Sequence, residues 1–223
     1  MKKASDKAIN KDEIKAREIA FKWIAQAAIR AGKLDPREKS DREILSRVAA
    51  FAKRLPKDFI IRGGIDHRDV LLDKAHEMSL QNKNEISCLL IATWTEHHIN
   101  GLILLQCENI GFKRDEINNV IREVQIRGKI TWLLKLIGLP PIPSNHTKNI
   151  LNLFEERNKY IHYKWKEFDI DKPDTRDDNS LLMLKRYKGT VRYLKYYYSR
   201  NALLGSEKRI NKLASKFSNL TTG

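Results

Sequence analysis

Residues 84–108, NEISCLLIATWTEHHINGLILLQCE, form the most apolar stretch of the chain. Apolar side chains recur through it from Ile86 to Leu105, which predicts a long buried helix. Glu96, His97 and His98 interrupt the apolar run well short of the roughly 20 residues that a membrane-spanning helix requires. We therefore expect this helix to be the centre of a protein core, and we expect no membrane as a partner.

Amphipathic helices are predicted on both sides of this central helix. They cover about 11–30, a segment after Pro36 that stops before Pro56, 114–137 with Gly128 as a point of bending, 144–165, and 181–204. Pro56 to Asp69 and the polar stretch 166–179 are expected to be connections. With no run of alternating strands, the fold class is all-α, an antiparallel helical bundle at 66–204 with an N-terminal helical extension at 1–65 and a basic tail at 205–223.

Composition narrows the class of partner and the compartment. The formal net charge of +15 and the pI near 9.8 favour anionic partners such as nucleic acid. Cys88 and Cys107 lie on one predicted helix roughly 28 Å apart, which is too far for a disulfide. No apolar segment follows the first residues as it does in a signal peptide, so we expect a cytoplasmic protein. No HExxH or CxxC spacing occurs, and neither metal nor cofactor is expected.

The predicted helix at 144–165 carries a guanidinium inside its apolar stripe. On an ideal helix its apolar residues fall between roughly −40° and +120° of Arg157, so Arg157 itself lies within the apolar arc. Asn158, at about 100°, and His162, at about 140°, flank one edge of that arc. Because an unpaired buried ion costs several kcal/mol, Arg157 requires a carboxylate, a phosphate or an interface. Glu96, an ionisable group in another apolar stripe, is the expected partner.

Arg157-Asn158 followed by three residues and His162 resembles the Arg-x4-His motif of HEPN domains (higher eukaryotes and prokaryotes nucleotide-binding). Arg62 and His67 have the same spacing, but Gly63 and Gly64 between them favour a loop. The resemblance covers the motif and its helical context, and it implies an antiparallel helical bundle with the motif on a late helix. It also implies a metal-independent endoribonuclease whose motif faces a second copy across a homodimer cleft.

The implied chemistry suits RNA, whose 2′-hydroxyl is a built-in nucleophile. The resemblance assigns proton transfer to His162, phosphate binding to Arg157 and orientation of the phosphate or ribose to Asn158, with Glu96 completing the expected catalytic set. The product would be a cyclic 2′,3′-phosphate. Toxin members carry Tyr at the position of Lys164, which their nucleotidyltransferase modifies, so the resemblance does not extend to that route of neutralisation. An inhibitor or antitoxin protein, and a role as a toxin or anti-phage effector, follow by family analogy alone.

Further RNA-binding residues are expected on and beside the motif and on the last predicted helix: Lys159, Tyr163, Lys164, Lys185, Arg186 and Arg192. The last helix interleaves cations with tyrosines, which can stack on unpaired bases. The same pattern fits an amphipathic helix whose tyrosines close the edge of the core. Two alternatives to the nuclease therefore stay open: a non-catalytic HEPN-like module that binds a nucleotide or protein, and a basic helical nucleic-acid-binding adaptor.

Overall fold

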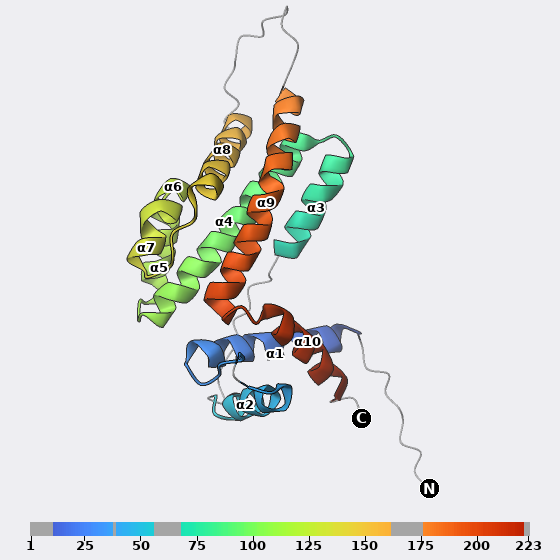
Figure 1. Cartoon of the computed structure of the whole chain (residues 1–223), viewed down its shortest axis with the longest axis vertical. Helices are drawn as coiled ribbons and strands as arrows, with labels where there is room; N and C mark the ends of the chain where they lie inside the picture. The colour runs from blue at the N-terminus through green and yellow to red at the C-terminus, as the bar shows by residue number, and fades with distance from the viewer. Residues whose placement is uncertain (1–10, 38, 56–67, 162–175, 221–223) are drawn as a thin grey trace, which may run out of the picture. The chain divides into compact units, whose positions relative to one another are not determined.

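The computed structural model of the protein describes residues 11–37, 39–55, 68–161 and 176–220 (Figure 1). All regular elements within these ranges are helices, which confirms the all-α prediction. The chain divides into two compact units: Met1–Gly63 together with Ser199–Gly223, and Gly64–Tyr198. We call them the terminal unit and the central unit and describe each by itself.

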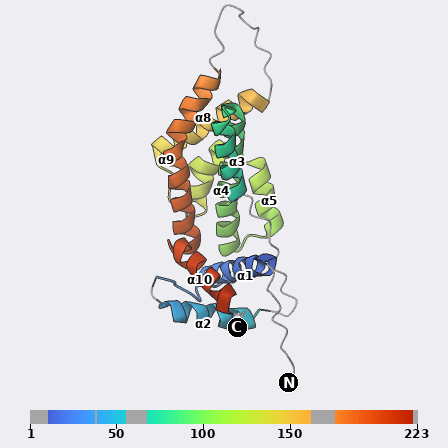
Figure 2. The same cartoon turned by 90° about the vertical axis from the view of Figure 1, so that its right-hand side faces the viewer.

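The central unit is a helical bundle. Its elements are α3 (Arg68–Leu80), α4 (Asn84–Asn109), α5 (Arg114–Glu123), α6 (Ile126–Gly128), the π-helical turn η1 (Lys129–Leu133), α7 (Leu134–Leu136), α8 (Ser144–Ile161) and most of α9 (Arg176–Leu203). Helices α3, α5 and α8 all pack on α4 (Figures 1 and 2). On α9, the hydroxyl of Tyr187 is 2.8 Å from that of Thr95 on α4, and both residues are buried. The apolar stretch 84–108 is thus the central helix of the bundle, as predicted.

Helix α4 holds both cysteines, which are buried and form no disulfide. This confirms the expectation that they do not pair with each other. Within the described residues, no helix combines the length and the apolar character that crossing a bilayer requires.

Two helices of the central unit depart from the predicted pattern. Helix α3 was not predicted, because the sequence beyond Asp69 was not assigned to any element; in the structure it packs along α4 and buries Ala75. Helix α9 begins at Arg176, five residues earlier than expected. Helix α3 is stabilised by its packing on α4, which begins after only three intervening residues, although the apolar pattern of α3 itself is weak.

The predicted helix 114–137 is interrupted, but not by a bend at Gly128. The break falls at Val124, whose backbone is extended (φ −85°, ψ 119°), while Gly128 is helical (φ −62°, ψ −42°). Gly128 is instead a point of close approach, because a Cβ there would lie 2.8 Å from Val124 Cγ1 and 3.0 Å from Trp132 Nε1. The following five residues form η1, a π-helical turn in which backbone hydrogen bonds span five residues instead of the four of an α-helix.

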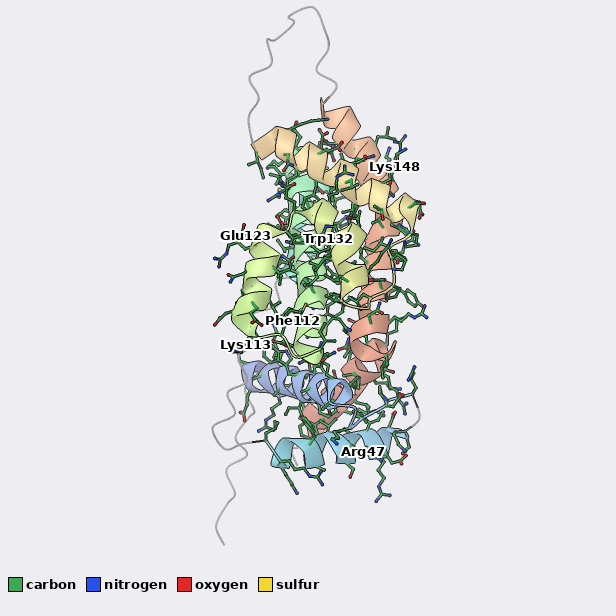
Figure 3. All side chains as sticks on the ribbon, turned by 90° about the vertical axis from the view of Figure 1, so that its left-hand side faces the viewer. Arg47, Phe112, Lys113, Glu123, Trp132 and Lys148 are labelled. Carbon is green, nitrogen blue, oxygen red and sulfur yellow. The ribbon has the colours of Figure 1, made fainter. Side chains whose placement is uncertain are left out.

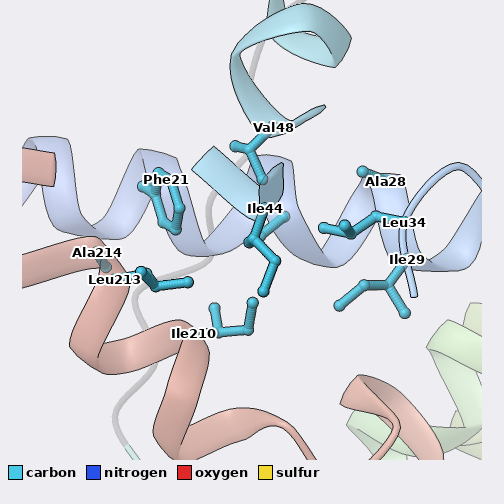
Figure 4. Close-up of a cluster of buried hydrophobic side chains, with 10 residues drawn as sticks. Phe21, Ala28, Ile29, Leu34, Ile44, Val48, Ile210, Leu213 and Ala214 are labelled. Atoms are coloured by element: carbon cyan, nitrogen blue, oxygen red, sulfur yellow. The ribbon is translucent and has the colours of Figure 1, made fainter. Parts of the chain in front are cut away.

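The terminal unit is formed by α1 (Lys11–Arg30), α2 (Asp41–Lys53) and α10 (Glu207–Leu220), with the last residues of α9. Its main cluster of buried apolar side chains consists of Phe21, Ala25, Ala28, Ile29, Leu34, Ile44, Val48, Ile210, Leu213 and Ala214 (Figure 4). Ser206 and Ser218 are also buried in this unit. The segment expected to be a basic tail therefore contributes a helix to this core. Its apolar residues recur three and four apart, and that spacing gives the otherwise basic segment a face to bury.

Arg209 connects α10 to the start of α2. Its guanidinium donates to Asp41 Oδ1 at 2.8 Å and to the carbonyl oxygens of Pro36 and Lys39. Helix α2 itself begins at a capping box, in which Ser40 accepts from the Glu43 backbone and the Glu43 carboxylate accepts from the Ser40 backbone.

Candidate functional site

Helix α8 carries the described part of the motif and is held by contacts with α4 and α9. Its apolar stripe, including Ile150, Leu153 and Phe154, is buried, and the helix packs on α4. His146 and Asn149 on its flank both lie 3.0 Å from the hydroxyl of Thr190 on α9. The last turn of α8 is therefore presented from a fixed support, with Arg157 and Asn158 near its C-terminal end.

Arg157 is half-buried, in agreement with its calculated place inside the apolar arc. Its guanidinium carbon is 5.5 Å from the centre of the Phe154 ring, a cation–π distance. Among the residues that the structure describes, no carboxylate lies within ion-pair distance of Arg157, and Asn158 beside it is exposed. His162, Tyr163 and Lys164 lie outside the described residues. The described part of the site thus consists of the Arg157 guanidinium, which has no carboxylate partner among the described residues, and the exposed amide of Asn158.

Glu96 does not form the ion pair with Arg157 that we expected. Its Oε1 lies 3.5 Å from Nζ of Lys129, a residue of η1. Lys129 is only 2% exposed, whereas Glu96 is 31% exposed, so the carboxylate connects a buried ammonium to the surface. The π-helical turn places a lysine on the side that faces the bundle, and a buried cation requires a nearby anion. Glu96 therefore forms its ion pair with Lys129 and not with Arg157.

Burial lowers the pKa of Lys129, and the nearby Glu96 carboxylate opposes this shift. Glu96 accordingly compensates for the cost of desolvating the lysine. The prediction that Glu96, a charge in a core stripe, needs an oppositely charged partner is correct, but the predicted partner is wrong. Lys129 becomes the partner because it lies on the π-helical turn, and no local pattern in the sequence predicts that turn.

The histidines next to Glu96 diverge, as neighbouring residues on a helix must. His97 is exposed, while His98 is buried and stacks on Trp94 with ring centres 4.6 Å apart. Arg68 completes this cluster, with Nη1 at 3.3 Å from His98 Nδ1. In the described parts of the chain, no three His, Cys, Asp or Glu side chains are grouped so that they could hold a metal ion.

The remaining expected RNA-binding residues separate into two groups. Lys185, Arg186 and Arg192 are exposed on α9, so they are available to an anion. Lys159 is exposed but forms an ion pair with Glu156 at 3.1 Å. The charge of Lys159 is therefore partly neutralised within its own helix.

The tyrosines of α9 contribute mainly to the core edge. Tyr197 is buried and donates to the carbonyl oxygen of Pro140, and Tyr193 stacks on His146 with ring centres 4.2 Å apart. Only Tyr196 of this group has a largely exposed ring. Of the two interpretations of the α9 pattern, closure of the core accounts for Tyr193 and Tyr197, and base stacking is open to Tyr196.

A basic hollow that the sequence did not indicate lies along α8. It measures about 450 Å³, and its walls come from η1, α7, the Pro140–Pro143 turn and α8. Arg127, Lys135 and Lys148 line it, all three are exposed, and one carboxylate, Glu155, accompanies them. These cations are spread over 22 positions of sequence, from 127 to 148, and come together only because the proline-rich turn folds α8 back beside η1.

No family model, no curated protein and no solved structure matches the chain. Function is therefore inferred from the motif on α8 and from the surfaces that surround it.

Proposed function

We propose that this protein is a metal-independent endoribonuclease of the HEPN type, with Arg157, Asn158 and His162 at its active site. The observation that carries the proposal is the state of Arg157, a half-buried guanidinium with no carboxylate within ion-pair distance among the described residues. A charge in that position costs free energy unless an anion is bound during function. A phosphodiester is an anion whose geometry matches the guanidinium fork.

The proposed reaction is a transesterification within the RNA strand. The 2′-oxygen forms a bond to phosphorus, the bond from phosphorus to the 5′-oxygen of the next nucleotide breaks, and a cyclic 2′,3′-phosphate results. The 2′-hydroxyl loses a proton and the departing 5′-oxygen gains one, and the proposed group for this transfer is His162, because imidazole is the side chain best suited to proton transfer near neutral pH. Arg157 stabilises the negative charge on the phosphate oxygens, and Asn158 orients the phosphate or ribose.

The proposed active unit is a symmetric dimer in which two copies of the motif face one cleft. One motif provides a single guanidinium, and a two-fold axis beside it doubles the number of cations without a further catalytic segment. Tyr160 and Ile161 at the end of α8 are 43% and 50% exposed, and such apolar area beside a site is available for an interface. Light scattering measures the stoichiometry, and mixing wild-type with His162→Ala chains tests whether activity depends on both copies.

The deciding experiment is cleavage of a single-stranded RNA in the presence of EDTA. Wild-type protein should cleave, whereas Arg157→Ala and His162→Ala should each reduce the rate by about 10²–10³-fold. Arg122→Ala and His97→Ala are matched controls, because both residues are exposed in the same unit and lie on helices other than α8. Full activity of a folded Arg157→Ala or His162→Ala protein would refute the assignment.

A nucleic-acid-binding adaptor without catalysis is the second candidate, and the basic hollow beside α8 favours it because binding alone would explain those cations. The same assay separates the two: an adaptor retains RNA that stays intact. If cleavage is observed, expression in a host cell should arrest growth for the wild type but not for His162→Ala, as expected for a toxin or defence effector. A protein that restores growth would then identify the inhibitor or antitoxin.

A further inference from the structure

Two hollows lie next to each other on the face of the central unit shown in Figure 3. The basic hollow of about 450 Å³ is on one side of Arg127 and Thr131, and a second hollow of about 430 Å³ is on the other side. Both residues line both hollows. The two form one recessed surface, which we call the η1 groove, divided by a low ridge at Arg127 and Thr131.

Trp132 forms one wall of the second hollow and is 51% exposed. Its indole nitrogen approaches Gly128 so closely that a Cβ at that position would lie 3.0 Å away, and the same Cβ would lie 2.8 Å from Val124. Gly128 therefore contacts the buried side of the indole, while about half of Trp132 is exposed to solvent. An exposed tryptophan on a fixed support is a platform on which another flat ring can stack.

The cations of the groove are free of local partners. Arg127, Lys135 and Lys148 are exposed, and within the described residues none of them forms an ion pair. Other exposed cations in the same unit do so, for example Arg114 with Glu108 and Lys74 with Glu77. Asn152 also lines the groove and provides a side-chain amide, whereas the hydroxyls of Thr131 and Thr147 donate to the carbonyl oxygens of Arg127 and Ile142. Three exposed cations that form no ion pair among the described residues lie in the groove together with the carboxylates Glu155 and Glu123. The cations beside an open aromatic ring are suited to phosphates that alternate with bases.

The α8 wall of the groove leads to the proposed active site. Lys148, Leu151 and Glu155 line the groove at a spacing of three and four residues, so they lie on one face of α8. Asn158 follows Glu155 by three residues and is rotated from it by roughly 60°. A strand that lies along this face reaches Asn158 within one further helical turn, whereas Arg157 is rotated by about 200° from Glu155 and lies on the other side of the helix.

We propose that the η1 groove binds single-stranded RNA, with a base stacked on Trp132 and successive phosphates on Arg127, Lys135 and Lys148, and that it leads the strand to Asn158 near the end of α8. The path of the strand from the groove to the end of α8 rests on the proposed ribonuclease function, whereas binding in the groove is independent of catalysis. The strand must be unpaired, because the bases of a duplex are already stacked on one another and do not offer a free face. The net charge of +15 favours a polyanion over a neutral partner.

The test measures binding of a labelled single-stranded RNA of about 12 nucleotides by fluorescence anisotropy, in a His162→Ala background so that no RNA is cut. Trp132→Ala should weaken binding about tenfold, and Trp132→Phe should restore much of the loss because a phenyl ring also stacks. Phe112→Ala is the matched control, since Phe112 is also 51% exposed but lies outside both hollows. Circular dichroism and thermal unfolding verify that each variant is folded.

A second measurement examines the cations. The triple variant Arg127→Ala, Lys135→Ala and Lys148→Ala should lower the slope of log affinity against log salt by about 2, because each phosphate contact on a single strand contributes about 0.7. Arg122→Ala should leave the slope unchanged. Unaltered affinity and slope in both the Trp132→Ala and the triple variants would overturn the proposal. Equal affinity for duplex RNA, or for polyglutamate at the same salt concentration, would also overturn it and indicate recognition of shape or of an acidic protein.

The outcomes separate this inference from the proposed function. If groove variants lose binding but the wild type never cleaves, the groove is an RNA-binding surface and the nuclease proposal fails. If the wild type cleaves through His162 while groove variants bind and cleave normally, the nuclease proposal stands and the groove proposal fails.

Discussion

Nζ of Lys129 lies 3.5 Å from Oε1 of Glu96, and the two residues differ sharply in burial. The lysine has almost no contact with solvent, while the glutamate is partly hydrated. The pair is therefore asymmetric: the lysine depends on the glutamate much more than the glutamate depends on the lysine.

Glu96→Gln should accordingly destabilise the central unit by about 1–3 kcal/mol, because it leaves a buried ammonium without an anion. Lys129→Met should cost less, since methionine occupies a similar volume and Glu96 can be hydrated. Urea denaturation of the two variants measures both free energies of unfolding. A larger loss for Lys129→Met than for Glu96→Gln would contradict this account of the pair.

Arg157 should be more important for function than for stability. Arg157→Met removes a charge from the edge of an apolar stripe and retains a side chain that packs on Phe154, so the free energy of unfolding should stay within about 1 kcal/mol of wild type or rise. RNA cleavage should nevertheless be lost. Denaturation and the cleavage assay with one protein preparation check both statements, and a strong destabilisation would indicate that Arg157 has a structural role instead.

His146 should make stability depend on pH. Burial lowers the pKa of His146 below its usual value, so the folded state favours the neutral imidazole. Its contribution is complete above the unfolded pKa of about 6.5 and is lost as the pH falls below that value towards the lower folded pKa. His146→Gln should remove this part of the decrease in unfolding free energy between about pH 7 and 5. His97→Gln, at an exposed position, is the control and should leave the decrease unchanged.

The terminal unit should require α10. Leu213→Ala removes a fully buried side chain and should cost about 2–5 kcal/mol. Arg209→Lys should be destabilising as well, because an ammonium cannot reproduce the planar fork that serves Asp41, Pro36 and Lys39 together. Lys208→Ala, on a neighbouring exposed position, should have little effect. Thermal unfolding of the three variants gives the comparison.

The sequence predicted those parts of the fold whose signals are local. The ends of α1 and α4 follow from apolar spacing and from the residues around Arg30 and Asn84. The break at Val124, the packing of α10 and the partner of Glu96 all depend on contacts between distant segments. Local propensity contains no information about such contacts, and tertiary packing overrides it where the two conflict.

The candidate site shows the same division. Periodicity placed Arg157 within the buried arc and Asn158 at its edge, which agrees with their half-buried and exposed positions. The η1 groove could not be found in this way, because Arg127, Lys135 and Lys148 belong to three segments whose convergence is decided by the turn at Pro140–Pro143.

The terminal unit takes its helices from both ends of the sequence, with α1 and α2 made first and α10 made last. During synthesis, α1 and α2 emerge from the ribosome long before Ile210, Leu213 and Ala214 are made. Until then, the apolar residues of α1 and α2 that pack against α10 remain exposed. A chain released before residue 207 would keep those faces exposed and would be an early target for chaperones and proteases. The terminal unit can therefore be completed only after the whole of the central unit has been synthesised.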